Sequence, residues 1–236
     1  MTYIDGQLQR FKAMIETAIR EGGEKGKESV IRSSALINLI HDAVKNEFIE
    51  RGVQPENIFP PLGQRTPELK LAGFLKQKDQ DVCIVPNGIQ KVPTTIAWGP
   101  LAFENKQDPY GMDFSTKTLV INVRSQMSSL AKNSDTLFER TFAEALNLHM
   151  RYPNIVLGEV YLIPVHEYDD EMVKERQVGF KVKQTNVEKY ISFFDSINNR
   201  KTGGANYAYE RCALRYCQEL CAKSVCRLRL NEVSQQ

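Results

Sequence analysis

The first fifty residues carry apolar side chains at helical spacing. A first helix is expected from Asp5, which can cap it, to the Gly22-Gly23 pair, and its apolar stripe is Leu8, Phe11, Met14, Ile15, Ala18 and Ile19. The polar segment GGEKGKES predicts a hinge. A second helix is expected over residues 30–51, because Gly52 stands where a C-terminal glycine stop belongs.

After the second helix the pattern changes from helical spacing to short apolar runs. Three prolines, Pro60, Pro61 and Pro67, exclude a helix here. Strands are expected over residues 68–75 and 81–85, and the short polar link between them predicts that they pair as an antiparallel hairpin. Residues 86–115 form a long excursion rich in Pro, Gly and Asn, and residues 117–123 predict a third strand.

The second half of the chain alternates between the two patterns. A helix is expected over residues 136–153, with a capping box of Thr136 and Glu139, followed by a strand over 155–165. Further on we expect a strand over 178–182, a helix over 187–197, a loop over 198–206 and a helix over 207–228. This order predicts an α/β (α+β) fold in which a mixed sheet is flanked by helices.

Composition restricts the class of protein further. The 236 residues are 42% hydrophobic and 25% charged, which is typical of a globular domain, and the net charge of +2 neither indicates nor excludes a nucleic-acid partner. No run is long enough to cross a membrane and the N-terminus does not resemble a secretion signal, so a cytoplasmic protein without membrane contact is expected. The absence of a Walker A or G-x-G-x-x-G motif predicts no nucleotide cofactor.

Cysteine and histidine patterns point to no metal centre or nucleophilic site. The spacing of Cys212, Cys217, Cys221 and Cys226 matches no usual zinc pattern, and these residues are expected to act as small hydrophobes of a C-terminal helix. The three histidines lie far apart, and His149, on the apolar side of its helix, is expected to be a core residue.

Four segments together resemble a known family. They are ELKLAGFLKQKDQDVCIVP, TLVINVRSQ, TLFERTFAEALNLHMRYP and VLGEVYLIPV, and their order, αβββαβ, is similar to the core of the PD-(D/E)xK nucleases. Asp81 matches the first Asp of the family motif, with Gln80 in the place of its Pro. Asn122 and Arg124 stand where the family has its acidic residue and its lysine.

The resemblance implies a Mg²⁺-dependent type II restriction endonuclease, part of a restriction-modification system, that cuts double-stranded DNA. It implies one nuclease domain over 1–236, with N-terminal helices (1–52), a catalytic core (60–165) and a DNA-contacting or dimerisation part (166–236). The implied catalytic set is Asp81, Glu68, Asn122 and Arg124. Of these, Asp81, Glu68 and Asn122 would hold Mg²⁺, and Glu68 would replace the missing carboxylate, with Glu104 and Asp113 as alternatives. Arg124 would act as a fixed charge because it does not lose its proton.

DNA contacts and a second subunit complete the hypothesis. The candidate DNA-binding residues are Lys76, Lys78, Gln126, Lys181, Lys183, Arg200 and Lys201, although such residues are also typical of solvated surface. A homodimer matching a palindromic site is expected, with the apolar stripe of the first helix at its interface unless that stripe packs on its own core. A non-catalytic DNA-binding protein on a degenerate core is the alternative function, and an interaction protein without a nucleic-acid partner is a third.

Overall fold

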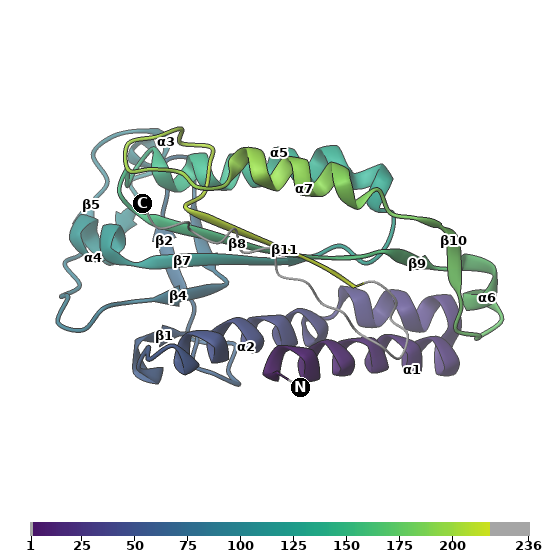
Figure 1. Cartoon of the computed structure of the whole chain (residues 1–236). Helices are drawn as coiled ribbons and strands as arrows, with labels where there is room; N and C mark the ends of the chain where they lie inside the picture. The colour runs from purple at the N-terminus through teal and green to yellow at the C-terminus, as the bar shows by residue number, and fades with distance from the viewer. Residues whose placement is uncertain (1, 218–236) are drawn as a thin grey trace, which may run out of the picture.

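The computed structural model describes residues 2–217. Its centre is a five-stranded mixed sheet in the order β1-β4-β7-β8-β11, formed by β1 (Ile58–Phe59), β4 (Val82–Ile84), β7 (Leu119–Ser125), β8 (Val156–Pro164) and β11 (Arg211–Cys217). Strand β4 runs antiparallel to β1 and β7, whereas β7, β8 and β11 are parallel to one another. Helices lie on both sides of the sheet (Figure 1), so the predicted mixed sheet flanked by helices is confirmed.

The N-terminal region is a helical hairpin that covers one face of the sheet. Helix α1 (Tyr3–Arg32) is broken at Gly23, whose φ of 57° and ψ of −135° are not helical, and its second arm runs back toward α2 (Ser34–Glu50) (Figure 1). The two arms of α1 touch, because a Cβ added at Gly26 would lie 2.1 Å from the Ala18 carbonyl oxygen. The predicted hinge is therefore confirmed as a bend, after which the helix resumes at once.

The apolar stripe of α1 is buried inside the chain. Phe11, Ile15 and Ile19 pack with apolar residues of α2 and with Val82, Ile121, Val123 and Leu162 of the sheet. These three side chains are therefore unavailable to a second subunit, which agrees with the alternative that the stripe packs on its own core, while the homodimer itself stays a prediction.

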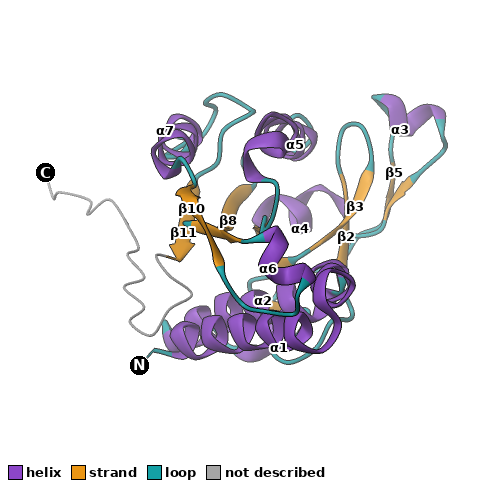
Figure 2. Ribbon diagram, turned by 90° about the vertical axis from the view of Figure 1, so that its right-hand side faces the viewer, coloured by secondary structure: helices purple, strands orange, loops and turns teal. Residues whose placement is uncertain are grey.

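The opposite face of the sheet is covered by α5 (Leu130–His149) and α7 (Val187–Ile197) (Figure 2). Leu157, Tyr161 and Ile163 of β8 pack there against apolar side chains of both helices. The bounds of α7 agree with the prediction. Helix α5 begins earlier than predicted, so Thr136 and Glu139 lie inside it and do not form its N-terminal cap.

Two predictions about strands are wrong. Residues 69–72 (β2, Leu69–Ala72) pair with β3 (Gln77–Gln80), and not with the strand after Asp81. The chain thus turns from one sheet into another at Asp81. Residues 207–210 form no helix and residues 211–217 form β11, parallel to β8, where a helix was expected over 207–228; its remaining residues 218–228, with Cys221 and Cys226, lie outside the described residues.

The remaining short elements extend the two ends of the sheet. The excursion after β4 contains β5 (Thr94–Thr95), α3 (Pro100–Phe103), β6 (Gln107–Asp108) and α4 (Gly111–Lys117), and the 3-10 helix η1 (Pro55–Asn57) precedes β1. Beyond β8 the chain forms β9 (His166–Tyr168), α6 (Asp170–Lys174) and β10 (Phe180–Gln184), with β9 and β10 paired. Across residues 2–217 there is no helix of the length and apolar character that a membrane crossing requires.

Candidate functional site

A row of polar residues crosses the centre of the sheet. Val82 pairs with Ile121, so the same register continued by one residue sets Asp81 opposite Asn122. Asn122 in turn pairs with Glu159 of β8. Directly paired residues project to the same face of a sheet, and Arg124, two residues after Asn122, projects there too. These four residues form the strand row: Asp81, Asn122, Arg124 and Glu159.

The strand row lies on the side of the sheet that α5 covers. The neighbours of Asn122 and Glu159 on that face, Val120, Leu157 and Tyr161, belong to the apolar core under α5 and α7. Ile121 and Val123 point to the other core, against α1 and α2. Asn122 and Arg124 therefore lie on one face of β7, and Ile121 and Val123 lie on the other.

Asn122 and Glu159 are buried without the hydrogen bonds that such groups need. Asn122 is 1% exposed, and neither its amide oxygen nor its amide nitrogen has a hydrogen-bond partner. Glu159 has a side-chain exposure of 0%, and its carboxylate accepts no hydrogen bond, although Oε1 lies 3.1 Å from Arg124 Nε. An unsatisfied buried polar group costs about 1–3 kcal/mol, so two side by side indicate a binding position more than a packing solution.

The charges around Arg124 perturb one another strongly. Burial raises the pKa of Glu159 to about 8, and the charge of Arg124 opposes this shift without cancelling it. Burial alone would lower the pKa of Arg124, but the carboxylates of Glu159 and Glu144 outweigh it and raise that pKa. Carboxylates with strongly raised pKa values are typical of functional sites.

Glu144, on α5, contacts the strand row from the helical layer that covers it. Its carboxylate pairs with the Arg124 guanidinium through Oε2 and with Lys78 Nζ through Oε1 at 2.8 Å. Arg124 Nη1 also lies 3.5 Å from the Thr141 hydroxyl. Arg124 is thus held by three elements, namely its own strand, β8 and α5.

The predicted residue Asp81 has a structural contact of its own. Its Oδ2 accepts a hydrogen bond of 2.9 Å from the Val123 backbone N–H, which extends the β4–β7 ladder beyond Val82. This contact fixes the carboxylate at the end of the strand. It also gives an Asp at this position a purely structural role.

The other predicted ligand, Glu68, lies just before β2. Leu69 pairs with Gln80, so the continued register sets Glu68 opposite Asp81. Partial burial raises the pKa of Glu68, and the charges of Asp79 and Asp81 raise it further. Glu68 is therefore near Asp81, but from the β2–β3 hairpin and outside the strand row. The two alternatives are exposed and ion-paired elsewhere, Glu104 with Lys106 and Asp113 with Lys117.

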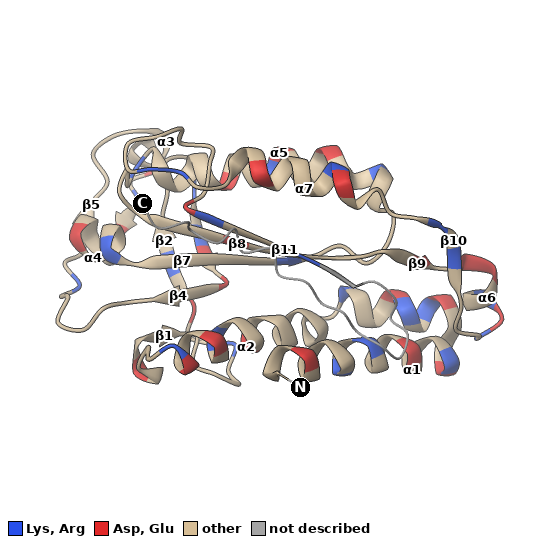
Figure 3. Cartoon of the chain, viewed as in Figure 1, with Lys and Arg blue, Asp and Glu red and all other residues tan. Residues whose placement is uncertain are grey.

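The predicted DNA-binding residues fall into two groups. Lys76, Lys183 and Lys201 are exposed, and Gln126 is half-buried and donates to the Ser128 carbonyl. Lys78 is paired with Glu144, and Lys181 lies 2.7 Å from Asp170 and 3.2 Å from Glu167. Lysines and arginines alternate with acidic residues over the helices and form no single basic face in this view (Figure 3).

Arg200 does not fit the expected role. Its side chain is 1% exposed, pairs with Glu210 at 2.8 Å and donates to the carbonyls of Pro153 and Ala205. It holds the loop after α7 in place and has no free guanidinium for a phosphate. His149 is also buried, as predicted, with Nδ1 3.0 Å from the Asn206 carbonyl oxygen.

The strand row, Glu144 and Lys78 together form a charged cluster. Two of its residues were not identified from the sequence. Glu159 is the one charged residue in the apolar run IVLGEVYLIPV, and a lone carboxylate in a buried strand is a signal that could have found it. Glu144 carries no such signal, because it resembles any surface glutamate of an amphipathic helix.

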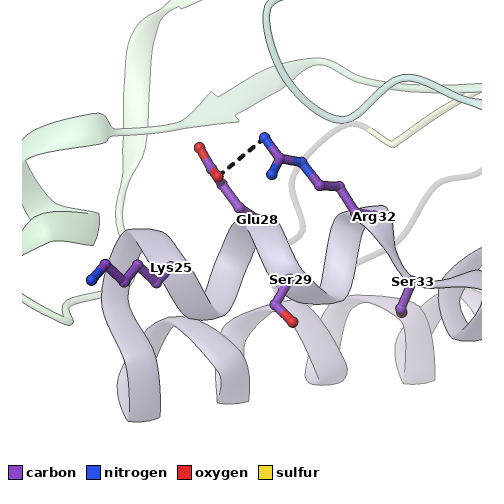
Figure 4. Close-up of a pocket in the computed structure, with 5 residues that line it drawn as sticks. All are labelled: Lys25, Glu28, Ser29, Arg32 and Ser33. Atoms are coloured by element: carbon purple, nitrogen blue, oxygen red, sulfur yellow. Dashed lines mark ion pairs between the residues drawn. The ribbon is translucent and has the colours of Figure 1, made fainter.

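Other surface features lie apart from this cluster. A hollow on the second arm of α1 is lined by Lys25, Glu28, Ser29, Arg32 and Ser33, and Glu28 pairs with Arg32 at 3.2 Å (Figure 4).

Within residues 2–217, no three His, Cys, Asp or Glu side chains are grouped closely enough to hold a metal ion. Any metal bound at the strand row would therefore need the Asn122 amide oxygen as a ligand.

The structure thus defines a mixed α/β protein with a buried charged cluster between its sheet and one helical layer. The chain matches no protein-family model, no curated protein and no solved structure.

Proposed function

We propose that this protein is a Mg²⁺-dependent endonuclease that cuts double-stranded DNA at a short specific sequence, as type II restriction endonucleases do. One observation carries the proposal: Asn122 and Glu159 are buried side by side in register with Asp81, the Asn122 amide has no hydrogen-bond partner, and the Glu159 carboxylate has only its ion pair with Arg124. Oxygen donors gathered in this way suit a hard divalent cation.

The residues present fit such a cation. Asp81, Asn122 and Glu159 would hold it, which makes Glu159, and not Glu68, the second carboxylate of the set. When bound, Mg²⁺ supplies a polarised phosphate oxygen and a water that loses its proton more easily. The buried Asn122 amide without a hydrogen-bond partner supports a bound ligand at this position.

The cations of the cluster supply what a phosphodiester substrate requires. Arg124 stays protonated, so it cannot accept a proton from water, but its planar guanidinium suits a pair of phosphate oxygens. Lys78, the most exposed cation of the cluster, and the exposed Lys76 of the same hairpin would contact the DNA backbone. A two-fold homodimer would match a palindromic site, and it would have to use a surface other than the buried stripe of α1.

A second candidate function is a DNA-binding protein that has lost catalysis. It is favoured by the absence, within the described residues, of three grouped metal-binding side chains, and by the ion pairs that already occupy Arg124 and Lys78. In this case Asp81 acts only to extend the β4–β7 ladder.

Cleavage of supercoiled plasmid DNA with Mg²⁺ and with EDTA separates the two functions. The Asp81→Asn variant is the sharpest test, because an amide oxygen can still accept from the Val123 N–H while the charge is removed. We expect DNA binding to survive and the cleavage rate to fall by about a hundredfold or more, the scale for losing one preorganised charge interaction. Asp79→Asn, in the neighbouring exposed pair with Lys70, is the matched control.

Two results would contradict the nuclease proposal. One is wild-type protein that binds DNA but does not cut a mixed-sequence plasmid or genomic DNA with Mg²⁺ or Mn²⁺, which supports the non-catalytic function. The other is an Asp81→Asn variant that cuts as fast as the Asp79→Asn control, which removes Asp81 from the site.

A further inference from the structure

The carboxylate of Glu144 bridges the two cations of the cluster. Oε2 contacts Arg124 Nη2, and Oε1 lies 2.8 Å from Lys78 Nζ. The two cations come from different elements, β7 and the β2–β3 hairpin, and among residues 2–217 Glu144 is the carboxylate that pairs with both. Two oxygens of one anion between an arginine and a lysine is also the arrangement in which proteins hold a phosphate group.

The exposed fractions order these side chains by depth. Lys78 is the most accessible at 28%, followed by Glu144 at 20% and Arg124 at 17%, and Glu159 is fully buried at 0%. Arg124 Nη2 and Lys78 Nζ are both paired with the Glu144 carboxylate. An anion from solution can therefore pair with these two nitrogens together only after that carboxylate has moved aside.

The backbone around this bridge is held in place by other contacts. Asn147, one turn after Glu144, accepts from the Leu75 and Lys76 backbone N–H groups at 2.8 and 3.2 Å through its Oδ1. Its own backbone carbonyl accepts from the Phe74 N–H at 2.6 Å. The hairpin that carries Lys78 is thus fastened to α5 independently of Glu144. Displacing the carboxylate requires a rotation of one side chain and no movement of the helix.

We propose that Glu144 is an internal competitor of phosphate: its carboxylate occupies the anion position formed by Arg124 and Lys78, and a DNA phosphate must displace it to bind. The inference rests on the proposed function, because it assigns the DNA backbone as the ligand of these two cations. It adds a restraint that the nuclease proposal lacks. In the free protein, Glu144 neutralises the two phosphate-binding cations until a DNA duplex competes for them.

The proposal predicts that removing the Glu144 charge strengthens DNA binding. In the glutamine variant, Lys78 and Arg124 no longer pair with residue 144, although Arg124 keeps its contact with Glu159, so both cations can meet a phosphate without breaking the Glu144 pairs. Each phosphate neutralised adds about 0.9 to the slope of log K against log salt, so the slope should steepen by about one to two. We expect Glu144→Gln to bind about tenfold more tightly at low salt, which corresponds to about 1.4 kcal/mol.

The experiment measures binding of a fluorescein-labelled duplex of mixed sequence by anisotropy, in EDTA, over a range of NaCl concentrations. Glu139→Gln is the matched control, because it removes the same charge from an exposed position of the same helix. The double variant Glu144→Gln/Lys78→Gln should lose about one unit of the gained salt slope, one phosphate contact in the counterion-release relation. Glu144→Met, close in volume to glutamate, replaces the glutamine variant if thermal melting shows that it is unfolded.

The outcomes separate this inference from the proposed function. If wild type binds DNA and Glu144→Gln binds equally or more weakly with an unchanged slope, the carboxylate does not compete with phosphate and the inference is overturned. An equal gain in Glu139→Gln also overturns it, since the effect is then general to the charge of α5. If neither wild type nor any variant binds a duplex, the proposed function itself fails.

Discussion

At the scale of single residues, Asn122 is the most informative position in the chain. It lies in the middle of an otherwise apolar strand, is 1% exposed and has no hydrogen-bond partner for its amide. A residue kept only for stability would be apolar here, because an unsatisfied buried amide is costly. Its presence is explained if the amide binds something during function.

Replacing Asn122 with leucine, which has a similar shape, should therefore stabilise the protein and abolish cleavage. We expect the free energy of unfolding to rise by about 1–3 kcal/mol, the cost of an unsatisfied buried polar group. Urea denaturation at constant pH measures the change, and the plasmid assay measures activity. A variant that is less stable than wild type would show that the amide has partners after all.

At the scale of elements, the contact between α5 and the β2–β3 hairpin positions the cluster. Asn147 holds the hairpin turn through both polar atoms of its carboxamide. Oδ1 accepts from the Leu75 and Lys76 backbone N–H groups, and Nδ2 donates to the Lys76 carbonyl at 3.2 Å. Gly73 passes so close to this side chain that a Cβ there would lie 2.1 Å from Asn147 Nδ2. The absence of a side chain at Gly73 thus leaves the space that the Asn147 carboxamide of α5 occupies.

Removing this amide should loosen the hairpin more than the rest of the molecule. We expect Asn147→Ala to lower the free energy of unfolding by about 1–3 kcal/mol, because two backbone N–H groups lose their acceptor. Hydrogen exchange of the hairpin amides should accelerate more than that of β7 and β8. Asn133→Ala, on the same helix, controls for helix propensity, and equal effects of the two variants would rule out a special role for Asn147.

At the scale of the whole molecule, Glu210 connects three parts of the fold. Its carboxylate accepts from the Leu157 backbone N–H at 2.7 Å, pairs with Arg200 at 2.8 Å and lies 3.6 Å from His149 Nε2. Burial alone would raise the pKa of Glu210, but the contact with His149 and the hydrogen bonds from Leu157 and Arg200 outweigh it and lower that pKa. The start of β8, the loop after α7 and the end of α5 therefore all depend on one charge.

This lowered pKa makes part of the stability dependent on pH. A carboxylate with a folded pKa below the unfolded value of 4.5 stabilises the fold above pH 4.5, and the contribution is lost as pH falls through the folded pKa. We expect Glu210→Gln to be less stable than wild type at neutral pH, and the difference to shrink in acid. Urea denaturation from neutral pH down to about pH 3 checks this. Glu188→Gln, an exposed carboxylate of α7, should show no such convergence.

The sequence by itself determined the elements whose pattern is local. Helix α7 has its predicted bounds because its apolar residues recur at helical spacing, and the hinge at Gly23 follows from a glycine pair in a polar segment. The strands expected over residues 81–85 and 117–123 are also present, as β4 and β7, with Asp81 directly before β4, and the two-residue period of a strand gives Asn122 and Arg124 the same face.

Only the tertiary structure decided which strands pair and what surrounds the central arginine. Residues 69–72 pair with 77–80, and residues 211–217 form a strand because β8 offers an open parallel edge to them. Such pairings join segments distant in sequence, and their free energy depends on neighbours that a local pattern does not contain. For the same reason Glu144 and Glu159 entered the cluster only in the folded chain, where α5 and β8 bring their carboxylates to Arg124.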